Sequence, residues 1–356
     1  AIARMPSRPG RHRWAGVGSA PEGSELAAST GARFCHHGAR RRPSPNPFRA
    51  EWARTLAAVQ RSVTFSLDFE DLRSDPSTQE ERVGSVTSRL LDRLAELGVV
   101  GTIFCVADVA SRHPELVARM VGDGHELGVH GLHHTPNDLL TPAQFAEQIS
   151  TAKSILEDLG GVPVTLYRAP QYSLVPETAW VPEILTGLGF VASSSVLPAK
   201  SPLYGWPGAP TTPFRWPSGL VELPAPVTRF GPSTIPFLGG AYLRVLPSRV
   251  RRRGIASTDP AVVLWTYCHP WEFDPDEPFY VFEDGGWVAS RIGWLNRRNM
   301  LRRVESVLLP APGPRLGDVV ASLGDLPVFD PAATPPVPTG SRLQGALRTR
   351  SRARAR

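Results

Sequence analysis

Three histidines fall within five positions of the segment VHGLHHTPND, residues 129–138. His130 and His134 are four residues apart, and His130 and His133 are three apart, so either pair can face one ion from a helix or a tight turn. Neutral imidazole suits Zn²⁺ and the other first-row divalent metals. An exposed histidine cluster is the alternative, so a metal site requires further ligands from elsewhere in the chain.

Acidic side chains that meet this requirement occur in the segment SLDFED. Asp68, Glu70 and Asp71 follow the β-favouring run Val63–Leu67, as expected of carboxylates at the end of a buried strand. One carboxylate can bind a metal while its neighbour, held by a cation, acts as a base. Two histidines and one carboxylate leave coordination positions open for water and substrate, as a hydrolytic site needs.

Arg168 in YRAPQYS and His269 in LWTYCHPWEFDPDEP complete the candidate site. Arg168 can pair with Asp68 and fix its position and protonation state. Pro170 stiffens the turn that follows and can aim the next backbone N–H at an oxyanion. His269 follows an apolar run and can donate a proton to a leaving amine near neutral pH. Each of these residues alone is compatible with a structural role, but their order and placement together indicate a hydrolytic metal site.

Segments with strand and helix patterns alternate along the sequence, and these elements position the candidate residues. Such alternation predicts an α/β fold with a mainly parallel sheet, in which active-site residues collect at the carboxyl ends of the strands. The density of Pro and Gly in residues 200–255 predicts an irregular insertion. The strands are expected at 63–67, 99–107, 125–131, 164–170, 190–196, 220–225 and 261–270, and the helices at 87–98, 113–124, 141–161 and 177–189.

Composition sets the broad class. The 356 residues suffice for one large domain or two ordinary ones, and 41% hydrophobic and 20% charged residues are typical of a soluble globular protein. No apolar run approaches about 18 residues, so we expect no transmembrane segment. The first residues lack the apolar core of a secretory signal, which favours a cytoplasmic or membrane-associated protein. Three cysteines without a CxxC pair argue against a disulfide framework.

Positive charge is concentrated at the two ends of the chain. Residues 1–50 carry nine Arg and two Glu, and residues 341–356 carry six Arg and no acid. Because the whole chain has a net charge of +6, residues 51–340 carry about −7. Composition predicts that residues 1–55 and 326–356 are disordered tails, rich in Arg and Pro. The net negative charge of residues 51–340 argues against nucleic acid as a partner.

The four segments that carry the candidate residues resemble, in order, motifs of the polysaccharide deacetylase superfamily, the NodB homology domain of the carbohydrate esterase family 4 type. FSLDFED is a variant of TFDDG, HELGVHGLHH is similar to HxxxH, YRAP resembles RxPY, and the HP pair at 269–270 fits the last motif. The Asp-x-Glu-Asp start and the HPWEFDP end are similar to the subgroup encoded beside exopolysaccharide and exosortase genes. The resemblance covers about residues 60–310 and implies a distorted (β/α)7 barrel and a catalytic domain over residues 60–325.

The resemblance also implies an activity. Members of the superfamily are hydrolases of carbon–nitrogen bonds other than peptide bonds, and the substrate expected here is an N-acetylated glycan whose N-acetylhexosamine units lose acetate. One divalent metal ion is implied, Zn²⁺ first, with Co²⁺, Ni²⁺ or Fe²⁺ as alternatives. The implied roles are Asp68 as base, Arg168 as its tether, His269 as acid, His130 and His134 as metal ligands, and Glu70 or Asp71 as the third ligand.

The chain departs from the family pattern at two further positions. Gln171 stands where RxPY has Tyr, and Ser193 stands where an Asp is expected; Glu272 or Asp274 are candidates to replace that acid. These departures motivate an alternative, a catalytically weakened glycan-binding or scaffold protein of exopolysaccharide assembly. A metal-independent hydrolase of cyclic amides on the same fold is a second alternative.

Overall fold

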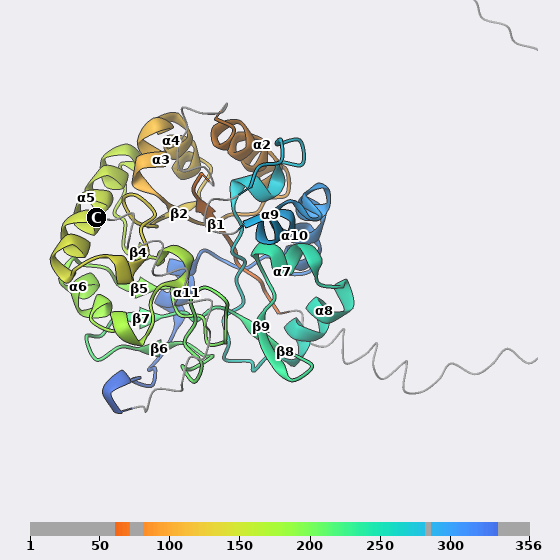
Figure 1. Ribbon diagram of the computed structural model, residues 1–356. Coiled ribbons are helices and arrows are strands. Elements are labelled where there is room, and N and C mark those ends of the chain that lie inside the picture. The colour runs from red at the N-terminus through yellow and green to blue at the C-terminus, as the bar shows by residue number, and fades with distance from the viewer. Residues whose placement is uncertain (1–60, 72–80, 282–285, 334–356) are drawn as a thin grey trace, which may run out of the picture. The chain divides into compact units, whose positions relative to one another are not determined.

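The computed structural model describes residues 61–71, 81–281 and 286–333, and its centre is one seven-stranded sheet (Figure 1). The strand order is β1-β2-β3-β4-β5-β7-β6, with parallel pairs throughout except for the antiparallel pair of β6 and β7. The first five strands neighbour one another in chain order, as successive β-α-β units do. The strands are β1 Phe65–Phe69, β2 Gly101–Cys105, β3 Glu126–Val129, β4 Leu166–Tyr167, β5 Ala192–Ser193, β6 Phe214–Arg215 and β7 Val221–Glu222.

Helices connect these strands and cover the outside of the sheet (Figure 1). They are α2 Val83–Glu96, α3 Ala107–Arg112, α4 Pro114–Gly122, α5 Pro142–Gly160 and α6 Val181–Gly187. The longest, α5, begins with a capping box between Thr141 and Gln144, and it ends at Gly161 in the left-handed conformation, with φ 64°. The apolar stripes of the helices pack with the outward side chains of the strands into one large core.

The sheet curls into a distorted barrel, as predicted. The chain returns to the free side of β1, where Trp265 pairs with Thr64 and Cys268 with Leu67 in parallel bridges. A second hydrophobic cluster joins side chains from strands far apart in the sheet order, which requires curvature. Its members include Phe104 of β2, Leu166 of β4, Ala192 of β5, Val221 of β7 and Trp265.

Residues 200–255 are more regular than expected. They contain β6 and β7, the hairpin of β8 Val227–Phe230 with β9 Ser233–Pro236, α7 Gly240–Val245 and most of α8 Ser248–Ser257. The prediction of an irregular insertion is therefore wrong after residue 213. Many of the Pro and Gly residues of this segment lie in turns between short helices and strands. One example is Gly231, with φ 58° in the hairpin.

The C-terminal part adds three helices that the sequence did not predict: α9 Gly286–Trp294, α10 Met300–Leu308 and α11 Leu316–Ser322. Residues 326–333, predicted to belong to the tail, also pack on the domain. Val328 forms a bridge with Arg215, and the Phe329 ring contacts Trp206, Phe214 and Trp216. This corrects the predicted start of the tail, because the aromatic contacts hold the segment; residues 1–55 and 334–356 lie outside the described residues.

Single 3₁₀ turns link these elements: η2 Asn137–Leu139, η3 Pro170–Tyr172, η4 Pro176–Thr178, η5 Pro270–Phe273, η6 Arg297–Asn299 and η7 Pro331–Ala333. Two of them, η3 and η5, directly follow Arg168 and His269 of the candidate site. Within residues 61–71, 81–281 and 286–333, no helix has the length and apolar composition needed to cross a bilayer.

Candidate active site

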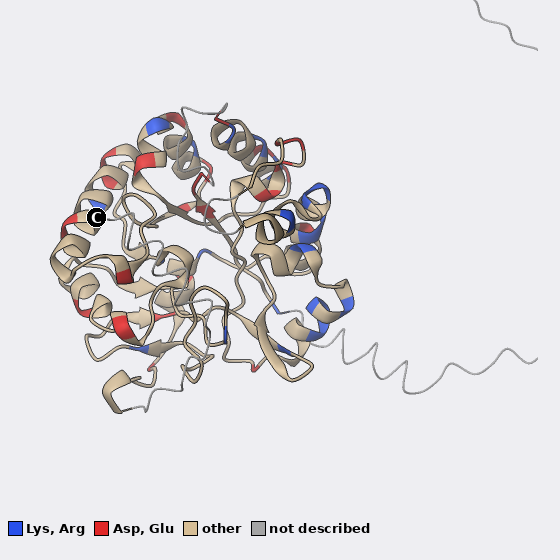
Figure 2. Ribbon diagram, viewed as in Figure 1, with Lys and Arg blue, Asp and Glu red and all other residues tan. Residues whose placement is uncertain are grey.

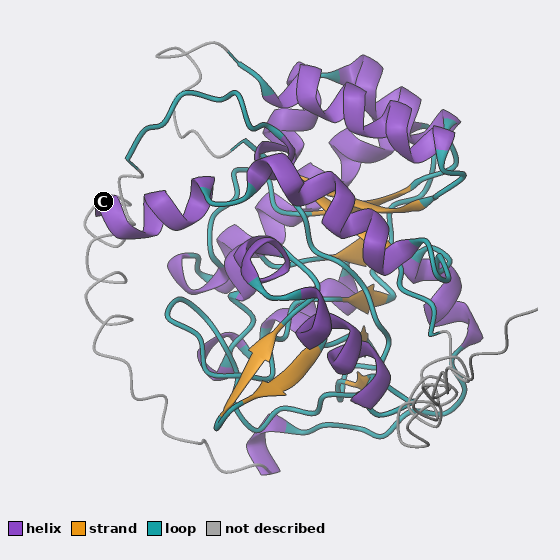
Figure 3. Ribbon diagram, turned by 90° about the vertical axis from the view of Figure 1, so that its right-hand side faces the viewer, coloured by secondary structure: helices purple, strands orange, loops and turns teal. Residues whose placement is uncertain are grey.

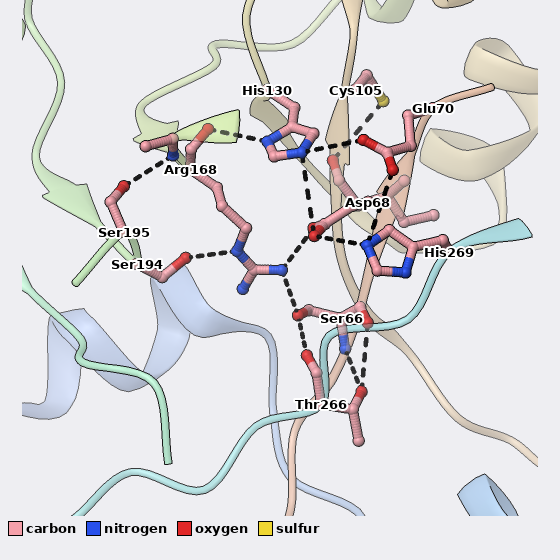
Figure 4. A network of polar contacts seen from close by, with 12 residues as sticks. Ser66, Asp68, Glu70, Cys105, His130, Arg168, Ser194, Ser195, Thr266 and His269 are labelled. Atoms are coloured by element: carbon pink, nitrogen blue, oxygen red, sulfur yellow. Dashed lines mark hydrogen bonds and ion pairs between the residues drawn. The ribbon is translucent and has the colours of Figure 1, made fainter. Parts of the chain in front are cut away.

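Asp68 lies near the carboxyl end of β1 and faces the interior of the barrel. The phenylalanine and leucine side chains of β1 pack into the outer core, so strand alternation turns Ser66 and Asp68 inward. The Arg168 Nη1 atom donates to Asp68 Oδ1 at 2.6 Å and to Ser66 Oγ at 2.9 Å (Figure 4). The second oxygen, Oδ2, lies 3.8 Å from His269 Nε2 and 4.0 Å from His130 Nε2. One oxygen of Asp68 is therefore held by a cation, while the other faces the histidines.

Arg168 follows β4 and is itself firmly held. Its Nε atom donates to Ser194 Oγ at 3.0 Å, and its guanidinium carbon lies 4.0 Å and 4.3 Å from the ring centroids of Phe104 and Trp265. The side chain is buried. A buried guanidinium needs a paired carboxylate and stacked rings to offset its lost hydration, and this site supplies both.

Glu70, His130 and His134 bring one ligand atom each to a common point. These atoms all lie within 4.8 Å of one another. Glu70 Oε2 is 3.4 Å from His130 Nε2 and 2.5 Å from His134 Nε2. His130 Nδ1 lies 2.9 Å from the carbonyl oxygen of Arg168, which can only accept, so Nδ1 carries the proton and Nε2 presents its lone pair. Ligands of one tetrahedral Zn²⁺ are about 3.3 Å apart, so this donor set fits a divalent metal.

The two other predicted candidates of this region lie elsewhere. His133 is exposed and contacts Asp108 of α3, so it faces away from the other two histidines. Among the described residues, the converging metal-ligand atoms belong to Glu70, His130 and His134 and not to Asp71. Asp71 lines an adjoining pocket with Glu70, Arg82 and Trp271.

A tight turn after β3 brings His134 back beside His130. Gly131 and His134 both adopt left-handed backbone conformations, with φ 92° and φ 56°. Glycine adopts this conformation freely, whereas a histidine there costs about 1 kcal/mol or more. The two imidazole rings end 5.0 Å apart between centroids. The strain is located at the residue whose side chain contacts Glu70.

His269 is oriented by a buried ion pair. Its Nδ1 and backbone N–H donate to Glu272 Oε2 at 2.9 Å and 3.1 Å, and the other oxygen of Glu272 accepts from Arg244 Nε at 2.7 Å. The ring stacks on Trp271 with centroids 5.0 Å apart and planes at 14°. Because Nδ1 is committed to Glu272, Nε2 points at Asp68 and lies 3.8 Å from Glu70 Oε1.

The acids and histidines perturb one another strongly. Burial acts to raise the pKa of Glu70, but the neighbouring His134 and His130 prevail and hold it well below its usual value. Burial acts to lower the pKa of His134 and of His269, yet the carboxylates raise both, to about 9 for His269. The site is thus organised around charged carboxylates.

Two segments of the chain are similar to known families. Residues 57–187 match the family model described as polysaccharide deacetylase. The chain is 28% identical over 99 residues to the chitooligosaccharide deacetylase of Bradyrhizobium sp. (strain ANU 289), which covers 28% of this chain and 43% of that protein.

A second relative of the deacetylase domain is the peptidoglycan-N-acetylmuramic acid deacetylase PdaA of Bacillus subtilis (strain 168). It is 28% identical over 91 residues, which cover 26% of this chain and 35% of PdaA. The chain thus spans less than half the length of these curated relatives. Among solved structures, Puue allantoinase matches with a TM-score of 0.46 and 19% identity, over 74% of this chain and 89% of that chain.

Residues 194–311 match a second model, a domain of unknown function (DUF3473). The candidate site draws on both matched segments. Asp68, Glu70, the two histidines and Arg168 come from the deacetylase match, whereas His269 and Glu272 come from the second one. The segment of unknown function therefore contributes two residues to the candidate site.

A buried acid from a different strand lies close to Ser193. Glu222 of β7 is fully buried, and its Oε1 accepts from the backbone N–H of Ser195 at 2.6 Å and of Val196 at 2.8 Å. The hydroxyls of Ser193 and Ser195 are 2.7 Å apart, and Ser195 Oγ accepts from Ala169 N at 2.8 Å. This chain of hydrogen bonds reaches the residue next to the site arginine. Burial raises the pKa of Glu222, although the bonds from the two backbone N–H groups oppose that shift.

The expected substitutes for the acid absent at Ser193 are engaged elsewhere. Glu272 pairs with His269, and Asp274 pairs with Arg82 at 2.5 Å. Sequence reasoning missed Glu222, for which the signal was a single acid in the apolar segment LVELPA. An unpaired acid in a buried strand needs donors, and here they are backbone N–H groups of the neighbouring strand segment.

The turn after Arg168 also differs from the family pattern. Gln171 and Tyr172 are consecutive non-glycine residues with left-handed backbones, φ 56° and φ 61°. Each costs about 1–3 kcal/mol unless the surroundings hold it. The Tyr172 ring packs edge-on against Tyr267 at 5.4 Å, while Gln171 is exposed. The tyrosine of the family motif is thus shifted by one residue and serves to anchor the turn.

Proposed function

We propose that the protein is a divalent-metal-dependent hydrolase that removes N-acetyl groups from N-acetylhexosamine units of a polysaccharide or oligosaccharide and releases acetate. The observation that carries the proposal is the convergence of Glu70, His130 and His134 beside Asp68, a carboxylate held by Arg168. Metal ligands and an adjacent restrained base are the parts that amide hydrolysis by water requires.

We assign the metal to Glu70, His130 and His134, which favours Glu70 over Asp71 as the carboxylate ligand. Zn²⁺ suits two imidazoles and one carboxylate, and Co²⁺, Ni²⁺ and Fe²⁺ are the alternatives. When bound, such a cation would act as a Lewis acid at the acetamide carbonyl and lower the pKa of water.

Asp68 is the proposed general base. Its Oδ1 is occupied by the Arg168 guanidinium, so Oδ2 is the oxygen that can take a proton from the attacking water. The bond to Arg168 fixes the orientation of the Asp68 carboxylate, so that Oδ2 faces the histidines. Arg168 is a positioning residue, since it is buried behind Asp68.

His269 is the proposed general acid. Glu272 holds Nδ1, so the Nε2 proton faces the site and can pass to the amine nitrogen as the carbon–nitrogen bond breaks. Arg244 fixes the far oxygen of Glu272 and keeps this carboxylate in place. The water oxygen bonds to the acetamide carbonyl carbon as a proton passes to Asp68, and the carbon–nitrogen bond breaks as His269 protonates the nitrogen, which leaves acetate and a free amine.

Similarity to a chitooligosaccharide deacetylase and a peptidoglycan-N-acetylmuramic acid deacetylase supports the substrate class. We propose an N-acetylated glycan, and an exopolysaccharide as the polymer that the motif variants favour. The decisive experiment measures acetate release from N-acetylglucosamine oligomers by the Zn²⁺-loaded full chain. Asp68→Asn should lower turnover by about a hundredfold or more while leaving metal content unchanged.

His133→Ala is the matched control, because His133 faces away from the site and should leave turnover unchanged. Turnover that survives chelation would favour the cyclic-amide alternative. Saturable glycan binding without acetate release would favour the scaffold alternative. Either result contradicts the proposed function.

A further inference from the structure

Helix α9 has its apolar side in solvent. Trp287 and Val288 are 60% and 67% exposed, and Ile292 and Leu295 follow on the same side at helical spacing, 46% and 50% exposed. The side that faces the protein carries Ser290 and Gly293, which are buried. We call the exposed residues Trp287, Val288, Ile292 and Leu295 the α9 face. A helix in a folded domain normally buries its apolar stripe, so this inverted arrangement indicates a surface that another partner covers.

The α9 face belongs to a layer of helices held together by arginines. Arg244 Nη1 of α7 donates to the carbonyl oxygens of Ile292 at 3.0 Å and Leu295 at 2.7 Å. Arg303 Nη1 of α10 donates to the carbonyl oxygen of Leu246, after α7, at 2.9 Å. These bonds fix α7, α9 and α10 as one unit, on the side that Figure 3 turns toward the viewer.

The charge of this layer is predominantly positive. Residues 240–257 and 286–308 contain ten Arg and one acid, Glu305, whose carboxylate pairs with Arg93. Figure 2 shows basic residues along α8 and α10. The Arg291 guanidinium lies 5.0 Å from the Trp287 ring centroid and 4.1 Å from that of Phe279, so its stem lies along the aromatic surface. Six of the arginines are exposed: Arg249, Arg252, Arg253, Arg291, Arg298 and Arg302.

We propose that the α9 face and these arginines dock the protein on the surface of an anionic phospholipid bilayer. An apolar helix side with Trp, beside exposed basic residues, is the pattern that inserts shallowly at a membrane interface. Each exposed arginine is attracted to anionic headgroups. A second copy of this chain would oppose arginines to arginines, so charge complementarity favours lipid over self-association.

The docking surface lies within residues 194–311, the segment that matches the domain of unknown function. None of its residues contacts Asp68, Glu70 or the metal-ligand histidines, and the inference does not depend on the proposed deacetylase activity. The inference gives residues 194–311 a role in placing the protein at a membrane surface.

Vesicle sedimentation tests the proposal. The full chain should sediment with vesicles of phosphatidylcholine and phosphatidylglycerol at 3:1 (about 25% anionic lipid), and far less with phosphatidylcholine alone. The variant Trp287→Ser/Val288→Ser/Ile292→Ser should bind at least about tenfold more weakly. Arg298→Glu/Arg302→Glu should lose at least about tenfold as well, and the remaining binding should be less sensitive to salt.

Matched controls lie on other surfaces. Val191→Ser/Val328→Ser removes equally exposed apolar side chains, and Lys200→Glu/Arg112→Glu makes the same change of charge. Both should bind vesicles like the wild type, and circular dichroism should confirm that every variant is folded. Equal sedimentation with and without vesicles overturns the proposal. So does a wild-type dimer in light scattering that Trp287→Ser dissociates, because the face would then be covered by a second copy.

Discussion

The carboxylate of Glu222 can be changed in two ways that separate its hydrogen bonds from its charge. Glu222→Ala leaves the backbone N–H groups of Ser195 and Val196 without an acceptor in a buried setting. Each buried, unsatisfied donor costs about 1–3 kcal/mol, and loss of the buried carboxylate offsets part of that cost. We expect Glu222→Ala to lower the free energy of unfolding by about 2–5 kcal/mol.

Glu222→Gln keeps one oxygen that can accept from both N–H groups, so it should cost less than the alanine variant. It also removes a titratable group. Because burial raises the pKa of Glu222 in the folded state, the folded chain binds the proton more tightly than the unfolded chain. The wild type therefore loses stability as pH rises from the unfolded value, about 4.5, through the raised folded value, by at most about 1.4 kcal/mol per pH unit. The glutamine variant should lack this contribution.

Urea denaturation of the wild type and both variants between pH 4.5 and 8 measures these differences. Acetate release supplies the functional readout, since Ser195 holds Ala169 N next to the site arginine. A cost below about 1 kcal/mol for Glu222→Ala would refute the reasoning. So would a glutamine variant whose stability relative to the wild type falls as pH rises.

Two further predictions concern stability. Arg244→Met removes the buried cation that pairs with Glu272 Oε1 and leaves His269 as the remaining partner of this carboxylate. It should lower the free energy of unfolding by about 3–5 kcal/mol in chemical denaturation; a cost near zero would contradict the role of this ion pair. Gly239→Ala places a Cβ 2.0 Å from the Tyr267 carbonyl oxygen and should lower the melting temperature strongly. Gly187→Ala, at an exposed position of α6, meets nothing within 4 Å and should not. Equal melting temperatures for the two alanine variants would contradict that contact.

The residues at the strand ends could be placed from the sequence, and the reason is topological. Asp68 lies near the carboxyl end of β1, and His130 and Arg168 directly follow β3 and β4. These strands belong to one parallel sheet, so the three residues meet at the same sheet edge. His269 was also predictable, because its segment returns beside β1. The choice between Glu70 and Asp71 could not be made, since it depends on the backbone path after the strand.

Other features depend on contacts between distant residues, which a single sequence does not reveal. Glu222 acts through backbone donors 26–27 residues away, and its role becomes visible only when β5 and β7 pair. Helix α9 was not predicted, because its apolar residues face solvent and its interior side carries Ser290 and Gly293. The packing of Phe329 rests on rings more than 100 residues earlier in the chain.

The most direct test of the central claim is the metal content of the purified chain, measured by mass spectrometry after dialysis against Zn²⁺. The account predicts one ion per wild-type chain, a similar content in His133→Ala, and loss of at least about tenfold in affinity in His134→Ala. Glu70→Gln should lose metal as His134→Ala does, while Asp71→Asn should retain it. Equal metal content in His134→Ala and the wild type, or retention in Glu70→Gln with loss in Asp71→Asn, would contradict the site described.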